Sequence, residues 1–473
     1  MLGWFVLVPL AAAIVLNLPS ADPLRRHGAI LTALLALAQV AAVVAVPAGV
    51  LSGAEVLAGQ LRLNLAVVNL SLVMLLTVGV AAFAAAMVVP AAITDLRDRG
   101  NFISVLLVCM AGMNGAVLVT DLFSLYVFLE VTSVASFVLI AFSRRKDALE
   151  GAFKYIVLSA VATALMLVSV ALLLMVAGGV DYASVAAALR VSGGSAPAKL
   201  AMGAFLCGLF IKGGLVPFHG WVLGAYSAAP APTSVLLAGV VTKVSGVYAL
   251  IRLATSVFPP SMALNHVLML VGAVSIVVGA LAALGQSDMK RLLAYSSISQ
   301  VGYIVLGLGC GTPLGVAGAI FHLFNHAVFK SLLFVNSAAV EQRLGTTDMD
   351  RLGGLGSRMP VTGVTSVVGI LSTAGVPPLA GFWSKLLIVV ALWQANHYTY
   401  AALAVLFSVV TLGYLLVLQR KVFFGKAADL PGLREAACWV TVPEILLAGL
   451  TIAIGLLFPF LNNTFLLQLR GGF

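Results

Sequence analysis

A lysine in the middle of a membrane-length apolar run is the first feature of this sequence that could do chemistry. Lys212 lies within Ala204–Tyr226, which reads AFLCGLFIKGGLVPFHGWVLGAY. Directly after it come Gly213, Gly214 and Pro217, residue types that interrupt regular helix. An ammonium group in hydrocarbon costs about 3 kcal/mol on insertion scales, and backbone freed at that depth must face protein or a water-filled cavity. The combination predicts a place where charge passes through the membrane.

A second group of titratable residues follows helical spacing. His322, His326 and Lys330 lie at i, i+4 and i+8 in FHLFNHAVFKSLLF, so they share one helix face and span ~12 Å along its axis. Histidine titrates nearest neutral pH, which suits such a stripe to proton relay. A zinc site is disfavoured because the metalloprotease motif needs Glu where Leu323 stands. An alternative is that at least one of the two histidines serves only in packing.

Three further charged residues fall inside apolar runs: Glu130, Lys243 and Lys385. Glu130 is the one acid that we place well inside a span, so pairing with Lys212 is expected, either as a structural lock or as a gated proton site. Lys243 lies about ten residues from Arg252, too deep for snorkelling to the interface.

Two other titratable residues are more ambiguous. His219, just past the break after Lys212, is either a relay residue or a cap for freed carbonyls. Glu444, near the start of the last apolar run, is expected to be interfacial.

The composition indicates a polytopic membrane protein. Of the 473 residues, 62% are hydrophobic and only 9% are charged, against about 25% charged in soluble domains. About fourteen apolar runs reach or approach the length of a membrane helix, and we interpret the whole chain, residues 1–473, as one all-helical transmembrane domain. The apolar start Leu2–Leu18 lacks a basic leader, so we expect a retained first span.

No motif for independent catalysis or cofactor binding is found in the sequence. It has no GxGxxG or Walker loop and no nucleophile–base pair, and its four cysteines form no CxxC. We therefore expect no cofactor, metal or redox centre of its own.

Loop charges predict the orientation. Of the 26 lysines and arginines, 17 fall in the loops after odd-numbered spans and five on the opposite side. The positive-inside rule then places the odd loops in the cytoplasm and both termini outside, in the cell (inner) membrane.

Two runs contain helix breaks at related positions. The seventh carries Gly213 and Pro217, and the twelfth, GILSTAGVPPLAGFWSKLLIVV, carries Pro377 and Pro378 before Lys385. Broken helices five spans apart are typical of inverted repeats around an ion path. We therefore predict two inverted five-helix repeats, approximately residues 102–253 and 266–424.

Seven sequence blocks in order resemble one known family. Between Phe102 and Phe424 the chain contains FLEVTSVASFVLIAF, ALEGAFKYIVLSA, FIKGGLVPFHGW, APAPTSVLLAGVVTKVSGVYALIR, DMKRLLAYSSISQVGYI, FHLFNHAVFKSLLF and GVPPLAGFWSKLL. These blocks are similar to the antiporter-like subunits shared by respiratory complex I, Mrp-type sodium/proton antiporters and membrane-bound hydrogenases, including formate hydrogenlyase.

The resemblance implies roles for particular residues. The implied proton-translocation set is Glu130, Lys212, Lys243, His322, His326, Lys330 and Lys385. Lys154, in the KY block, matches a recurring family feature and joins His219 as an accessory residue. Some family members carry glutamate at the position of Lys385. The chain departs from the family's usual W-L-P after the PFH block, because Val222 and Leu223 follow Trp221.

Three functions follow as hypotheses. The first is a proton-translocating subunit of a redox-driven complex, the ion-pumping part of an oxidoreductase translocase. The second is a subunit of a Mrp-type sodium/proton antiporter without a redox partner, and the third is a non-conducting scaffold. The first two imply other membrane subunits as partners, including further antiporter-like subunits, with protons and in the second case sodium as the transported ions.

Overall fold

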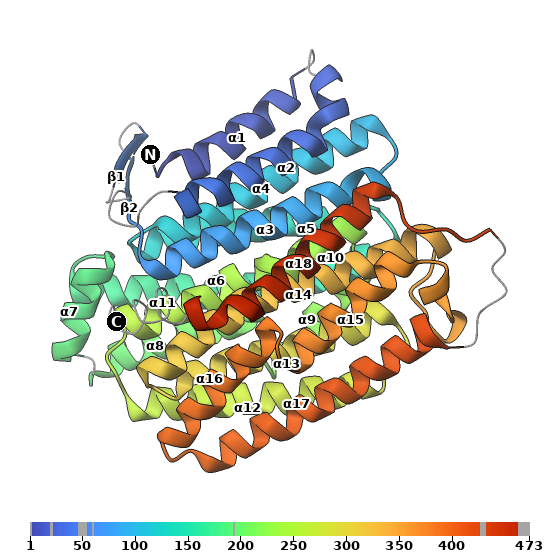
Figure 1. Ribbon diagram of the computed structural model, residues 1–473. Helices are drawn as coiled ribbons and strands as arrows, with labels where there is room; N and C mark the ends of the chain where they lie inside the picture. Colours follow the sequence, from blue (N-terminus) through green and yellow to red (C-terminus); the bar gives the residue numbers. More distant parts are fainter. Residues whose placement is uncertain are drawn as a thin grey trace.

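The computed structural model describes residues 2–18, 22–45, 54–58, 61–192, 194–425 and 432–461. The described residues form a bundle of helices that lie side by side, with α1 (Trp4–Leu16) and α17 (Tyr398–Gln419) at opposite edges (Figure 1). The predicted all-helical membrane fold is confirmed in this part of the chain. Lys426 and Arg470, which belong to the loop and tail cations counted above, lie outside the described residues, as does the side chain of Arg62.

The N-terminal half holds eleven α-helices, one hairpin and two π-helical turns within the described ranges. In chain order after α1, its elements are α2 (Asp22–Ala45), β1 (Ala54–Ala58), β2 (Leu61–Leu65), α3 (Asn69–Ala92), α4 (Leu96–Leu118), α5 (Leu122–Ala141), α6 (Lys146–Ala177), α7 (Tyr182–Ser192), α8 (Ala196–Gly213), α9 (Gly220–Ala228), α10 (Ala231–Leu236), η2 (Leu237–Val241), η3 (Lys243–Tyr248) and α11 (Ala249–Ser256).

The C-terminal half is built in a similar way. Its described elements, besides α17, are α12 (Met262–Leu284), α13 (Met289–Gly309), α14 (Pro313–Leu344), the 3₁₀ turns η4 (Met349–Arg351) and η5 (Leu355–Ser357), α15 (Pro360–Ala374), α16 (Ala380–Gln394), the π-helical turn η6 (Arg420–Phe424) and α18 (Cys438–Leu461).

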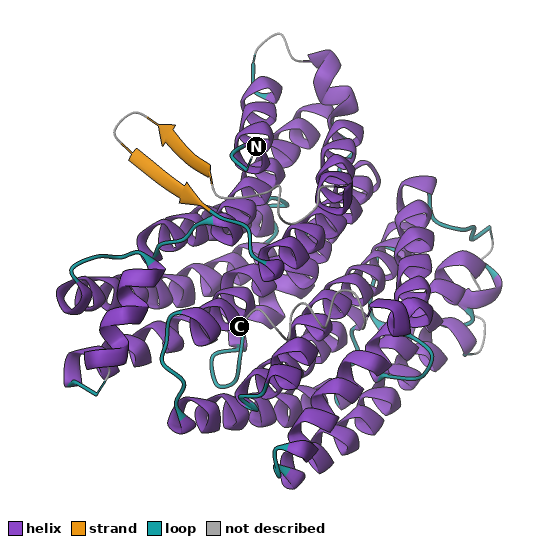
Figure 2. Cartoon of the chain, turned by 60° about the vertical axis from the view of Figure 1, so that its left-hand side comes forward, coloured by secondary structure: helices purple, strands orange, loops and turns teal. Residues whose placement is uncertain are grey.

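Twelve helices in the described residues are long and apolar enough to cross a membrane, with α10 to α11 counted as one. Three shorter apolar helices are α1, α15 and α16. If α1 and the consecutive pair α15–α16 each complete one crossing, twelve plus two gives the expected number of spans. The β1–β2 hairpin, paired from Ala54↔Leu65 to Ala58↔Leu61, was not predicted from the sequence, and it projects from one end of the bundle (Figure 2).

The centre of the bundle is formed by α14, which packs against α3, α10, α13, α15, α16 and α18 (Figure 1). Its apolar stretch is 94% buried, whereas that of α6 is only 33% buried. Both helices are apolar, but for different reasons. The α14 surface packs against protein, whereas much of the α6 surface is left for contact with lipid. The buried polar side chains therefore distinguish the inner helices from the outer ones.

Helical structure stops at both glycine–proline stretches that the sequence singles out. After α8 ends, Gly214 takes a left-handed conformation with φ of 66°, and α9 begins six residues later at Gly220. After α15 ends, Gly375 has φ of 87° and α16 begins at Ala380. Glycine adopts this conformation at little cost. That the two gaps mark equivalent places in two repeats remains a prediction.

The contact between α8 and η3 depends on two glycines. A Cβ added to Gly246 would lie 2.2 Å from the Cα of Gly213 and 3.0 Å from the carbonyl oxygen of Leu209. Both neighbours are backbone atoms, so rotation of a side chain cannot relieve the overlap. The pair therefore sets how closely the segments carrying Lys212 and Lys243 approach each other.

We predict that Gly246→Ala destabilises the protein by about 1–3 kcal/mol, the usual cost of overpacking a filled core. Thermal unfolding of the purified protein in detergent should show a lower midpoint. Gly203→Ala, on the exposed face of α8 with no atom within 4 Å of its added Cβ, is the matched control and should unfold at or above the wild-type midpoint, because alanine favours helix. Equal midpoints for the two variants would contradict the packing argument.

Candidate functional site

The predicted ion pair between α5 and α8 is present. Lys212 Nζ lies 2.8 Å from Glu130 Oε1 and also donates to Ser133 Oγ at 2.9 Å and to Ser159 Oγ at 3.1 Å. These three oxygens match the three donors of an ammonium group. Because the Lys212 side chain is only 1% exposed, this arrangement offsets the cost of its desolvation.

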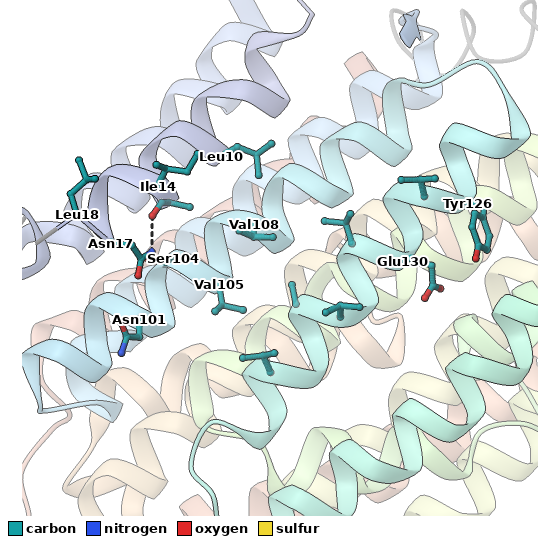
Figure 3. A pocket seen from close by; sticks show the side chains of 16 residues that line it. Leu10, Ile14, Asn17, Leu18, Asn101, Ser104, Val105, Val108, Tyr126 and Glu130 are labelled. Atoms are coloured by element: carbon teal, nitrogen blue, oxygen red, sulfur yellow. Dashed lines mark hydrogen bonds between the residues drawn. The ribbon is translucent and has the colours of Figure 1, made fainter. Parts of the chain in front are cut away.

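Glu130 is the more accessible partner of the pair. Its side chain is 29% exposed and lines a groove of about 1050 Å³ between α1, α4 and α5. Figure 3 shows Glu130 and Tyr126 together in this groove, with Leu10 and Ile14 on the neighbouring α1 and Leu18 just after it. The carboxylate thus joins a buried ammonium on one side to an open, mostly apolar groove on the other.

Lys243 lies fully buried where the eighth span turns π-helical. It begins η3, and its Nζ donates to the backbone oxygen of Ala238, five residues earlier. π-helical turns leave a local mismatch in the backbone hydrogen-bond pattern and are frequent at functional sites. No described side chain bridges Lys243 to Lys212 by a hydrogen bond, so the two lysines are not directly linked.

The α14 stripe is buried along its whole length. His322 and His326 stack with ring centroids 6.2 Å apart and planes 8° from parallel. His322 Nδ1 lies 2.9 Å from Ser384 Oγ on α16, whereas neither ring nitrogen of His326 has a partner in the described part of the chain. Lys330 Nζ donates to the backbone oxygen of Leu293 on α13 at 3.3 Å.

Lys385, on α16, completes the central group. Its Nζ donates to the backbone oxygen of Ala374 at 3.3 Å and lies 4.5 Å from the ring centroid of Tyr303, a cation–π distance. Ala374 is the last residue of α15, so the ammonium meets the negative end of that helix.

The structure therefore collects the predicted residues into two groups. One is the Glu130–Lys212 pair. The other is the central cluster, which we define as Lys243, His322, His326, Lys330 and Lys385. Within it, His322 contacts Ser384, the residue before Lys385, and α14 packs against η2, which ends two residues before Lys243.

The two accessory residues lie apart from the central cluster. Lys154 forms an ion pair of 2.6 Å with Glu150 on the same helix, and both side chains are more than half exposed. His219 is half-buried immediately before α9, and its Nδ1 has no partner among the described residues.

The interfacial position expected for Glu444 is wrong. Glu444, on α18, is fully buried. Asn336 Nδ2 donates to its Oε1 at 2.9 Å, and Thr362 Oγ1 lies 3.1 Å from its Oε2. The burial became possible because α14 and α15 present polar side chains at that depth. The sequence signal was the apolar run on both sides of Glu444, in TVPEILLAGL.

Lys290 also differs from expectation. It belongs to the cations assigned to loops, but its side chain is only 2% exposed and its Nζ lies 2.6 Å from Glu341 Oε2. The ion pair joins the first turn of α13 to the last turn of α14, and the acid at the end of α14 makes burial of the lysine tolerable.

Known proteins resemble this chain over most of its length. Residues 119–411 match the family model described as "NADH:quinone oxidoreductase/Mrp antiporter, TM". The chain is 34% identical to a Na(+)/H(+) antiporter subunit of Alkalihalophilus pseudofirmus, over 77% of this chain and 74% of that protein. It is 37% identical to an NADH-quinone oxidoreductase subunit of Desulforudis audaxviator, over 67% of this chain and 64% of that protein.

Similar structures extend the match to the whole chain. A chain in the structure of the Mrp complex from Dietzia superposes with a TM-score of 0.89 at 27% identity, covering 100% of this chain and 96% of that one. The resemblance predicted from the sequence blocks is thereby confirmed. This chain is a multi-pass membrane protein that belongs to the NADH:quinone oxidoreductase/Mrp antiporter transmembrane family, whose members include antiporter-like subunits of multi-subunit membrane complexes.

Proposed function

We propose that this chain translocates protons along a line of buried residues from the Glu130–Lys212 pair through the central cluster to Lys385. The observation that carries the proposal is the central cluster itself. Its three lysines are almost fully buried, with 0–4% exposure, and no carboxylate pairs with any of them in the described residues. Ionisable groups at that depth are costly and typically mark ion paths.

Proton transfer along this line uses exchange between neighbours. His326, whose ring nitrogens are both unpartnered among the described residues, lies between Lys330 and His322 on α14. A proton added to one lysine raises the cost of a second proton on the next. Breaking the Glu130–Lys212 pair therefore changes the proton affinity of the central cluster, and a charge shift passes sideways while protons cross vertically.

The two-repeat organisation, residues 102–253 and 266–424, remains part of the proposal. Two features support it. Isolated β-bridges join Asp121 to Asp181 and Asp288 to Asp348, and Asp121 and Asp288 each cap the helix that follows. The helices after those capped ones, α6 and α14, are both 32 residues long. The two bridges occur five spans apart. Because five is an odd number of crossings, the bridges lie on opposite sides of the membrane, as two units of opposite topology require.

Two assemblies fit a proton-translocating subunit. We propose first a redox-driven complex, in which the partners carry the redox centres; the relative from an NADH-quinone oxidoreductase supports this choice. The second candidate is a Mrp-type sodium/proton antiporter, supported by the relative from a Na(+)/H(+) antiporter and by the Mrp complex structure. Native purification of the chain with its partners distinguishes them. Recovery of quinone-reducing or hydrogenase subunits supports the first, and recovery of antiporter subunits alone supports the second.

We propose that the protein resides in the cell (inner) membrane with both termini outside. Reporter fusions at Arg145 and at Ala198 should report opposite sides, with Arg145 in the cytoplasm, because most of the basic residues lie in the loops after odd spans. The reverse result would refute this orientation.

Glu130→Gln should lower proton translocation by at least about tenfold, since a group that relays protons usually contributes that much. Assembly should survive, because Ser133 and Ser159 still accept from Lys212. Proton uptake by membrane vesicles containing the assembled complex measures the effect. The control is Glu150→Gln, which removes an exposed ion pair of 2.6 Å and should leave uptake unchanged. Normal uptake by Glu130→Gln would remove the pair from the path.

Lys243→Ala and Lys385→Ala, tested separately, should each cut proton translocation while subunit composition stays intact. Lys421→Ala, which removes an exposed lysine paired with Asp350, is the control and should transport normally. Wild-type rates in both buried-lysine variants would mean that this subunit is a non-conducting scaffold.

A further inference from the structure

A second buried carboxyl group lies outside the line described above. Glu444 is fully buried on α18, and its neighbours from the packed helices are uncharged: Asn336 on α14 and Thr362 on α15. The facing helix α3 carries no charged residue, and Lys385 of α16 binds Ala374 instead. The titratable group that shares a hydrogen-bond partner with Glu444 is Glu435, in the segment before α18.

Glu435 occupies a position suited to an ionised carboxylate. Its Oε2 accepts from the backbone N–H of Val361 at 2.7 Å, and its Oε1 accepts from that of Ala436 at 3.1 Å. Val361 lies in the first turn of α15, whose positive end favours an anion. Arg343 donates to the backbone oxygen of Glu435, so a cation is also close. Glu435 is half-buried and reaches the protein surface.

The hydroxyl of Thr362 joins the two carboxyl groups. Its Oγ1 lies 2.8 Å from Glu435 Oε1 and 3.1 Å from Glu444 Oε2. A hydroxyl has one hydrogen, so it donates to only one of them. With Glu435 ionised, Thr362 donates to Glu435 and accepts from a protonated Glu444. This arrangement satisfies both contacts and avoids an unpaired buried charge.

The inner end of this arrangement is unsatisfied. Asn336 donates from Nδ2 to Glu444, but its Oδ1 is buried without a partner in the described residues. On the same helix, the hydroxyls of Ser337 and Ser331 are also buried and unpartnered there. Ser331 adjoins Lys330 in sequence. Asn336 lies six residues after Lys330, about 9 Å along the helix axis. Ser337 lies seven residues after Lys330 and therefore on nearly the same face of α14.

We propose that Glu435, Thr362 and Glu444 form a proton relay between the protein surface and the central cluster, with Glu444 holding the proton at rest. In the outward step, Thr362 passes its hydroxyl hydrogen to Glu435 and takes the proton of Glu444. One proton moves, leaving Glu435 neutral and Glu444 ionised, and no other reactant is needed. The inward step reverses these transfers. Delivery to Lys330 rests on the proposed function, whereas the protonated state of Glu444 does not.

Infrared spectroscopy of the assembled complex tests the resting state. Glu444→Gln reproduces the neutral form, since its amide donates to Thr362 and accepts from Asn336. The spectrum of the wild type minus that of Glu444→Gln at neutral pH should contain one carboxylic acid carbonyl band. Its absence would show that Glu444 is ionised and would overturn the proposal. A band that disappears on addition of sodium would assign the site to a cation and would also overturn it.

Transport assays test the relay itself. Thr362→Val keeps the side-chain shape and removes the hydroxyl, so proton uptake should fall by at least about tenfold, while Thr362→Ser should restore it. Thr451→Val is the matched control, because that buried hydroxyl donates to the backbone of its own helix. Wild-type uptake by Thr362→Val in an intact complex refutes the relay. The carbonyl band is measured without transport, so it separates failure of this relay from failure of the function proposed above.

Discussion

The cost of holding ammonium groups away from water is the constraint on which the rest of this structure depends. The protein meets this cost in two ways. Lys212 has a carboxylate and two hydroxyls around its Nζ. Lys330 and Lys385 instead have one backbone oxygen each at 3.3 Å. The first arrangement holds a charge firmly, whereas the second offsets little of its desolvation. The difference separates an ammonium group with three hydrogen-bond partners from ammonium groups with few partners.

Irregular backbone supplies the oxygens that two of the three central lysines use. Lys243 bonds to the carbonyl of Ala238 within π-helical turns, and Lys385 bonds to the carbonyl of Ala374 at the end of α15. Carbonyls within an α-helix already accept from a backbone N–H, whereas the last four carbonyls of a helix have no such partner. Continuous helices would also span the membrane, but they would leave these lysines without acceptors. The interruptions in regular structure therefore help Lys243 and Lys385 to find an acceptor.

The sequence predicted a buried contact correctly where opposite charge identified both partners, as in the pair of Glu130 with Lys212. Glu130 was found because few acids lie deep, while several lysines do. Glu444 was missed because its partners, Asn336 and Thr362, are uncharged and give no pairing signal. Lys290 was wrongly predicted to be an exposed loop residue. The sequence does not reveal that Glu341, at the end of another helix, lies close enough to pair with it. The β1–β2 hairpin was missed because it is short and lies among long apolar runs. Periodicity thus recovered the spans and the titratable stripe but not the polar contacts between helices.

Two acids that lie within spans, Glu130 and Glu444, differ in a way that bears on transport. Glu130 faces an ammonium, whereas Glu444 faces neutral side chains and shares a hydroxyl with Glu435. The three lysines of the central cluster have no carboxylate partner in the described residues. Two unit charges about 10 Å apart interact by roughly 1.7 kcal/mol at an effective dielectric of about 20. That energy shifts a protonation equilibrium by more than about tenfold. On the function proposed above, moving one proton at either acid changes the protonation equilibrium of a lysine at that distance by a comparable factor.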